Sequence, residues 1–202
     1  MPKVAYSELE REQIRESLIA AGLDLMIKQG IMHTTVEQIY KSVGISRTFF
    51  YSFFPTKEDL IVESLYLQQP KLIEYVCELR NDPGLSWRDG VRQLLYSLCY
   101  GEKFGIAVLT TEEQQLIFKR LSKESYRVFR EKQFRLFNTI LEIFGVYADP
   151  EQLKLLINLA LTIMITGRAS PNYLPMLIPE AADATVEFQI EAFVEYLEKL
   201  KE

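Results

Sequence analysis

The stretch from Thr34 to Lys57 reads T-T-V-E-Q-I-Y-K-S-V-G-I-S-R-T-F-F-Y-S-F-F-P-T-K, and it decides the fold. Its first half predicts a short helix, because Thr34 and Thr35 can each cap a helix start. Glu37 and Gln38 stand three residues on from these threonines and complete a capping box in either case. Valine and isoleucine then recur at helical spacing, which predicts one apolar side facing a core.

A second short helix is predicted after a tight turn. Gly44 permits the left-handed backbone that ends the first helix, and Ser46 can cap the next one. Phe50 and Phe54 stand four residues apart, so both fall on the inner side of the second helix. Two short helices joined by a turn of a few residues make a helix-turn-helix.

The outer side of the second helix has the shape and chemistry to enter the DNA major groove. We expect it to present Ser46, Arg47, Thr48, Phe49, Ser52 and Phe53. Arg47 can donate two hydrogen bonds to guanine, Thr48 can bond a base edge, and Phe49 can pack on a thymine methyl. Tyr51 stands where its hydroxyl can reach a phosphate.

Lys57 falls in the first turn of the following helix, where the helix dipole disfavours a cation. A phosphate docked at that helix start would reverse the penalty, because backbone N–H groups and the lysine would share one anion. In the alternative interpretation Thr56 caps the helix with Asp59, and Glu58 and Asp59 balance the lysine locally. The sequence leaves both interpretations open.

The stretch resembles the DNA-binding domain of TetR-family transcriptional regulators. That family's usual run is T-T-V-x-x-I and then G-V-S-x-x-x-L-Y-x-x-F-P-S-K. The chain offers Thr34–Ile39 and then G-I-S-R-T-F-F-Y-S-F-F-P-T-K over Gly44–Lys57. The resemblance implies an all-α fold, with a helix-turn-helix DNA-binding domain in residues 1–56 and a helical ligand-binding and dimerisation domain in residues 57–202. It also implies that phosphates are held by Thr35, Tyr51 and Lys57, and that Arg47 and Thr48 face bases.

Composition limits the partners. The chain has 202 residues, a net charge of −5 and 48% hydrophobic residues, which argues against general adhesion to nucleic acids or membrane surfaces. Residues 1–60 carry seven Lys and Arg against eight acids, so DNA affinity must come from a few placed contacts doubled by dimerisation. No apolar run follows a basic stretch at the N-terminus, so we expect no signal peptide. The apolar segment Leu153–Ile165 is too short to span a bilayer. With only Cys77 and Cys99 as cysteines, we expect a cytoplasmic protein without membrane contact.

Helical periodicity continues through the rest of the chain, and strand signals are absent. We expect helices over 8–29, 57–80, 112–121 and 122–145, one starting at Ser86, one from Asp149-Pro150 to about Gly167, and one from Pro179 to the C-terminus.

Two of these helices predict self-assembly. The helix 150–167 is apolar on nearly every side, and the last helix has a seam of apolar residues with four-three spacing. In the TetR family, which the sequence resembles, these helices form a four-helix dimer interface. The residues predicted for it are Leu156, Leu159, Ile163, Ile190, Phe193 and Leu197. The alternative is that the helix 150–167 lies at the centre of a monomer.

The resemblance also implies an effector pocket within residues 85–180. The predicted lining residues are Tyr96, Tyr100, Phe104, Tyr126, Phe129, Gln133, Asn158 and Thr162. Asn158, Thr162 and Thr166 line up four residues apart, so they can orient a ligand or satisfy one another across a dimer. The cations Arg120, Lys123, Arg127 and Arg130 predict a solvated face paired with Glu124 and Glu131.

These features predict a repressor that binds a palindromic double-stranded DNA operator as a homodimer and is released by an unidentified small apolar or aromatic effector. An enzyme is not expected, because His33 is the only histidine and no Cys/His cluster has metal-ligand spacing. We therefore expect no catalytic residue, cofactor or metal. The alternative function is a ligand-binding or scaffold dimer of the same fold with weak or lost DNA binding.

Overall fold

The computed structural model describes residues 6–99, 109, 111–169 and 177–202, and every named element within these ranges is a helix. This architecture confirms the predicted all-α class. The helices are α1 (Glu8–Gln29), α2 (Val36–Val43), α3 (Arg47–Phe50), α4 (Lys57–Leu67), α5 (Gln69–Asn81), α6 (Trp87–Cys99), α7 (Thr111–Arg120), α8 (Lys123–Ile143), α9 (Pro150–Ala169), the 3₁₀ turn η2 (Pro179–Ala181) and α10 (Ala182–Glu198).

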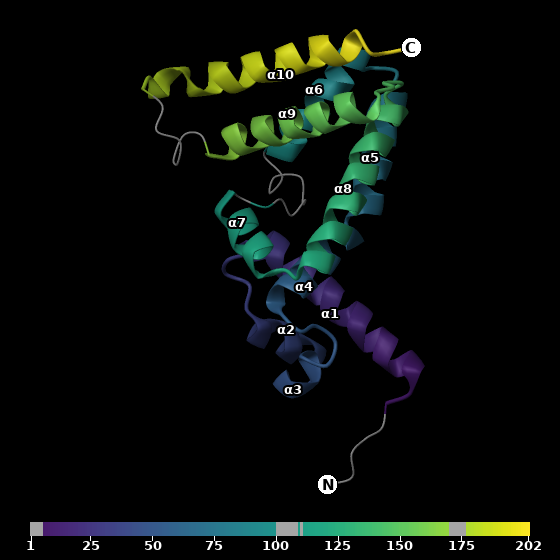
Figure 1. The fold of residues 1–202 in the computed structure, drawn as a ribbon, viewed down its shortest axis with the longest axis vertical. Helices are drawn as coiled ribbons and strands as arrows, with labels where there is room; N and C mark the ends of the chain where they lie inside the picture. The colour runs from purple at the N-terminus through teal and green to yellow at the C-terminus, as the bar shows by residue number, and fades with distance from the viewer. Residues whose placement is uncertain (1–5, 100–108, 110, 170–176) are drawn as a thin grey trace.

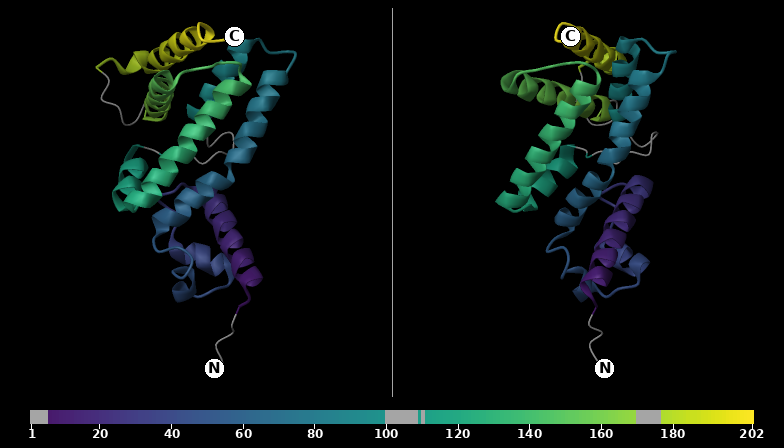
Figure 2. Two further views of the ribbon diagram at one scale, coloured as in Figure 1. Left: turned by 45° about the vertical axis from the view of Figure 1, so that its right-hand side comes forward. Right: turned by 90° about the vertical axis from the view of Figure 1, so that its right-hand side faces the viewer.

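The helices gather at two ends of an elongated molecule (Figure 1). Helices α1 to α4 form the end near the N-terminus, and α5, α6, α9 and α10 meet at the other end. Helix α8 runs alongside α5, as both views of Figure 2 show. Helix α7 shares an apolar cluster with α1 and α4. Within the described residues, no helix is long and apolar enough to cross a membrane.

Local capping fixes the N-terminal end as predicted. Thr35, not Thr34, caps α2, and it forms the capping box with Gln38. Gly44 ends α2 in the left-handed conformation at φ 75°, and Ser46 accepts a hydrogen bond from the Phe49 amide to start α3. The core behind these helices contains Leu18, Ile19, Ile39, Phe50, Phe54 and Leu60. The prediction that Phe50 and Phe54 face inward is confirmed, since their exposed fractions are 0% and 2%.

The predicted single helix over 57–80 is wrong, because the chain breaks at Gln68 into α4 and α5. Pro70 stands in the first turn of α5 and has no amide hydrogen to donate back into α4. Helix α4 thus packs on α1, whereas α5 packs on α6 and α8. The other predicted helices are present with small shifts of their ends, and Pro179 opens η2 ahead of α10.

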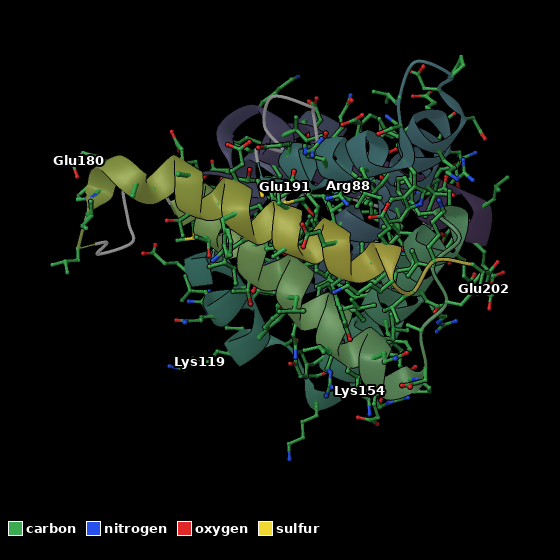
Figure 3. All side chains as sticks on the ribbon, turned by 90° about the horizontal axis from the view of Figure 1, so that it is seen from above. Arg88, Lys119, Lys154, Glu180, Glu191 and Glu202 are labelled. Atoms are coloured by element: carbon green, nitrogen blue, oxygen red, sulfur yellow. The ribbon has the colours of Figure 1, made fainter. Side chains whose placement is uncertain are left out.

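Helices α5, α6, α8, α9 and α10 share one large apolar core. Helices α6 and α9 approach closely at Gly167, where a Cβ would lie 2.9 Å from the Cys99 sulfur. On the outside, Arg88 and Arg92 of α6 reach Glu191 of α10, and Figure 3 shows Arg88 beside Glu191. Glu191 is held ionised because hydrogen bonding to Arg92 lowers the pKa of its carboxyl.

Candidate DNA-binding and ligand-binding sites

The short helix α3 and the residues that flank it carry most of the predicted DNA contacts. Ser46, Arg47, Thr48 and Ser52 are all exposed, and Tyr51 is 40% exposed. The Arg47 guanidinium lies over the Tyr51 ring, 5.9 Å from its centroid, and forms no ion pair within the described residues. The polar edge of α3 thus faces solvent while Phe50 and Phe54 fix its inner side.

The two outer aromatic residues of α3 are covered by the start of the chain. The Tyr6 ring stacks on Phe49 with centroids 4.8 Å apart. The Arg11 guanidinium lies 5.5 Å from the Phe49 centroid and 4.8 Å from that of Phe53. Both rings are therefore half-buried, and Phe49 already has an aromatic partner. No sequence pattern predicts this contact, because Tyr6 precedes the first helix and has no fixed spacing to α3.

Thr35 and Lys57 both have partners within the chain. The Thr35 hydroxyl takes part in the α2 capping box with Gln38. The Lys57 ammonium donates to the Ile31 carbonyl at 3.0 Å, and partial burial lowers the pKa of this lysine. The capping of α4 by Thr56 with Asp59 is also present. Lys57 therefore ties the start of α4 to the turn that precedes α2, a contact that neither sequence interpretation included.

Helix α7 contacts the end of the molecule that α1 to α4 form. The Met32 amide donates to the Glu113 carboxylate at 3.1 Å, and Arg120 pairs with Glu58 at 2.9 Å. An apolar cluster lies between these polar contacts. Its buried members are Leu23, Met26, Ile31, Ile61, Val62, Leu65, Leu109, Ile117, Leu121 and Phe129. The turn between α1 and α2 is thus fixed to α7 by both polar and apolar contacts.

The described members of the predicted ligand set are divided among different parts of the structure. Tyr126 and Phe129 join Phe118 in an aromatic group, with ring centroids 5.1 and 5.4 Å from that of Phe118. Tyr96 packs against the main core instead, and Gln133 is half-buried on α8. Tyr100 and Phe104 lie outside the described residues.

Asn158 and Thr162 are exposed on α9. The hydroxyls of Thr162 and Thr166 donate to carbonyls one turn earlier in the same helix, at 2.8 and 2.9 Å. The two threonine hydroxyls therefore need no ligand to satisfy their donors. Exposed Leu155 and Leu159 lie on the same side of α9.

Most of the residues predicted for the dimer interface are packed inside the subunit. Its buried members, with exposed fractions of at most 7%, are Leu156, Ile163, Ile190, Phe193 and Leu197. They belong to the core shared with α6 and α8, because α9 and α10 each turn this side inward. Of the predicted residues only Leu159 is exposed, at 38%. The apolar surface of the two helices lies instead at Leu155, Leu159 and Phe188, with exposed fractions of 47%, 38% and 73%.

The helix-turn-helix geometry agrees with a match to a known family. Residues 18–63 match the model of the bacterial regulatory proteins of the tetR family. The helix-turn-helix segment is therefore similar to that of the tetR-family regulatory proteins. In Bacillus subtilis (strain 168), the uncharacterized HTH-type transcriptional regulator YuxN is 25% identical over 150 residues, which are 70% of this chain and 48% of YuxN. The uncharacterized HTH-type transcriptional regulator YwcC of the same strain is 31% identical over 78 residues, which are 37% of this chain and 35% of YwcC. The chain spans less than half the length of either relative.

Solved structures share the fold of this chain. A TetR regulator from Rhodococcus sp. RHA1 has a TM-score of 0.60 at 16% identity, covering 91% of this chain and 97% of its own. The regulator SCO7518 from Streptomyces coelicolor A3(2) has a TM-score of 0.57 at 19% identity, with coverages of 92% and 98%. The repressor FadR of Thermus thermophilus, solved with lauroyl-CoA, has a TM-score of 0.57 at 21% identity, with coverages of 91% and 92%.

Residues 18–63 match a model of regulatory proteins, and the fold of the chain is similar to that of solved transcriptional regulators. Among the described residues, no group of three His, Cys, Asp or Glu side chains could hold a metal ion.

Proposed function

We propose that this chain is a TetR-family repressor that binds a palindromic operator as a homodimer and leaves it when a small effector binds. One observation carries the DNA-binding part of the proposal. Ser46, Arg47, Thr48 and Ser52 form an exposed polar edge on α3, and the buried rings of Phe50 and Phe54 hold the opposite side. A short helix presented in this way suits base-edge contacts in the major groove.

The homodimer is supported by the exposed side of α9 and α10. Leu155, Leu159 and Phe188 are large apolar side chains at the surface, and Asn158 and Thr162 lie among those of α9. A second copy would cover these apolar side chains and pair with the polar ones. A two-fold dimer places its two reading helices about 34–36 Å apart, in successive turns of the major groove.

Release by an effector is supported by the position of α7. Its Glu113 and Arg120 contact the DNA-binding end, and its Phe118 contacts Tyr126 and Phe129 of α8. A ligand that displaced this aromatic group would move α7, and with it the turn between α1 and α2. Changing the bound fraction from 99:1 to 1:99 requires about 5.5 kcal/mol of differential binding, which two subunits can share. FadR, of similar fold, was solved with an acyl-CoA.

The proposal keeps residues 1–56 as the DNA-binding domain and residues 57–202 as the helical domain. Because Leu60 of α4 packs in the core of the first domain, α4 connects the two. A regulator of this kind works on the chromosome, so we place the protein in the bacterial cytoplasm.

Fluorescence anisotropy of the purified protein on DNA from upstream of its own gene tests the proposal. We expect saturable binding that weakens as salt rises, because phosphate contacts release counterions. Failure to bind that DNA better than an unrelated duplex at any salt concentration would favour the scaffold alternative.

A further inference from the structure

Two buried polar groups lie unpaired at the break between α4 and α5. The Tyr66 hydroxyl and the Gln69 amide nitrogen are both buried, and neither has a hydrogen-bond partner within the described part of the chain. Tyr66 belongs to the last turn of α4 and Gln69 opens α5, with Gln68 in helical conformation between them. Residues three apart in such a backbone lie on the same side. Leaving buried donors unpaired costs free energy, so this location requires an explanation.

A cation from α8 faces the same location. The Lys132 ammonium lies 3.7 Å from the centroid of the Tyr66 ring, and Lys132 is half-buried. This lysine has no ion pair in the ranges that the structure describes. On the same helix, Arg127 binds both Glu124 and Glu131. Lys132 is thus a partly desolvated cation whose neighbour is an aromatic ring and not a carboxylate.

All three groups are hydrogen-bond donors. Burial, and after it the negative charge of Glu63, raises the pKa of the Tyr66 phenol, so this group stays protonated at neutral pH and can donate. The Gln69 nitrogen and the Lys132 ammonium donate in any case. An apolar wall adjoins them, because Tyr66 stacks on Phe129 at 6.2 Å and Phe129 meets Phe118. The location therefore offers three donors, one positive charge and an aromatic surface.

We propose that the break between α4 and α5 binds an organic anion, namely a carboxylate on an aromatic or alkyl body. The carboxylate accepts hydrogen bonds from Tyr66, Gln69 and Lys132, and its apolar body packs against Phe129. A carboxylate has several acceptor sites and no donor, which matches three unpaired donors. An uncharged apolar molecule of the same shape leaves those donors unpaired and binds less tightly. This inference rests on the proposed function, because it assigns the chemical class of the effector.

The anion would also connect the two ends of the molecule. Tyr66 is on α4, which packs on α1, whereas Lys132 is on α8, which packs on α5. Drawing Lys132 from the Tyr66 ring towards a carboxylate changes the contact between α4 and α8 at the helix break. A ligand bound at this position lies directly beside α4, the helix that shares a core with α3.

Isothermal titration on DNA-free protein tests the chemical class. The probes are 2-naphthoate and decanoate, each compared with its methyl ester, which keeps the body and removes the charge. We expect at least one carboxylate to bind about tenfold more tightly than its ester, as expected for hydrogen bonds to a charged group. Absence of carboxylate binding, or equal binding of acid and ester in both pairs, overturns the proposal.

Variants then test the three donors. Lys132→Met keeps the aliphatic stem and should weaken carboxylate binding about tenfold, whereas Lys119→Met, at an exposed position on α7, should not change it. Tyr66→Phe should weaken carboxylate binding severalfold and leave the melting temperature of the ligand-free protein unchanged or raised, since its hydroxyl has no partner. A lowered melting temperature with unchanged carboxylate binding would make the hydroxyl structural and overturn its role.

DNA binding is measured separately by anisotropy. A protein that binds carboxylates through Lys132 without binding DNA supports this site and contradicts the repressor. A protein that binds its operator but prefers esters contradicts this site alone.

Discussion

Arg47 and Lys57 are both cations predicted to contact DNA, but their surroundings differ. Arg47 is exposed on α3 over the Tyr51 ring, so its guanidinium is available to a base edge. Lys57 is half-buried, and its ammonium already donates to the Ile31 carbonyl. Removing the first side chain should affect recognition alone, whereas removing the second should affect both the fold and phosphate binding.

Arg47→Ala should relax base preference without destabilising the protein. An exposed residue with no ion pair in the described structure should change the free energy of unfolding by less than about 0.5 kcal/mol. Losing a bidentate contact should reduce discrimination at one base pair by about 1–3 kcal/mol. Anisotropy on the operator and on its single-base-pair variants measures this change. Discrimination equal to that of the parent at every position would remove Arg47 from the reading residues.

Lys57→Met should lower the free energy of unfolding by about 1 kcal/mol, because the hydrogen bond to Ile31 is lost. It should also weaken binding to all DNA sequences and reduce the salt slope by about 1. Urea unfolding and anisotropy at several salt concentrations measure the two effects. Lys41→Met is the control, since Lys41 is exposed and pairs only with Glu37. Lost stability with an unchanged salt slope would mean that Lys57 holds the turn and contacts no phosphate.

Helices α1 and α4 pack closely enough to exclude a methyl group between them. A Cβ on Gly22 would lie 2.6 Å from a Leu60 methyl and 3.0 Å from the Ser64 hydroxyl. Leu60 has an exposed fraction of 0%, and the Ser64 hydroxyl donates to the Ile19 carbonyl, so neither neighbour can move freely. This contact fixes the angle between the first helix and the helix that leads to α5.

Gly22→Ala should therefore destabilise the protein by about 1–3 kcal/mol through overpacking, although alanine favours a helix more than glycine does. Urea unfolding measures the change, with Ser17→Ala on the exposed side of α1 as the control. A more stable Gly22→Ala protein would show that the two helices can separate at little cost.

Periodicity and capping predicted most of the helices, because these signals act within a few residues of the chain. Spacing alone predicts the inward rings of Phe50 and Phe54 and places the start of α2 at Thr34 or Thr35, of which the structure has Thr35 as the cap. The break at Gln68 was missed because a proline in the first turn of a helix is permitted, so Pro70 does not by itself mark a new start. The stacking of Tyr6 on Phe49 and the contact of Glu113 with Met32 join distant segments, which no local pattern encodes.

At the scale of the whole molecule, one apolar side of α9 and α10 packs in the subunit core and another lies at the surface. The four-three seam packs inside the subunit, while Leu155, Leu159 and Phe188 remain at the surface. Sequence spacing identified the apolar residues but not which side meets the subunit's own core, because both sides satisfy the same periodicity. We therefore base the dimer prediction on the exposed side.

Leu159→Glu and Phe188→Glu should each give a monomer, because a charge would be buried in the proposed interface. Operator affinity should fall by about a hundredfold or more, since the two half-sites are no longer bound together. Light scattering after gel filtration and anisotropy measure both effects. Leu116→Glu, at an exposed position on α7, should remain dimeric. Dimers of both interface variants would place the interface elsewhere.

The inward packing of the four-three seam has a consequence for how the chain acquires its structure. Ile190, Phe193 and Leu197 are shielded from water by helices of the same polypeptide. Each polypeptide can therefore complete its core alone, and pairing comes afterwards. Refolding followed by circular dichroism should be first order and independent of protein concentration, with association visible only as a later, second-order phase.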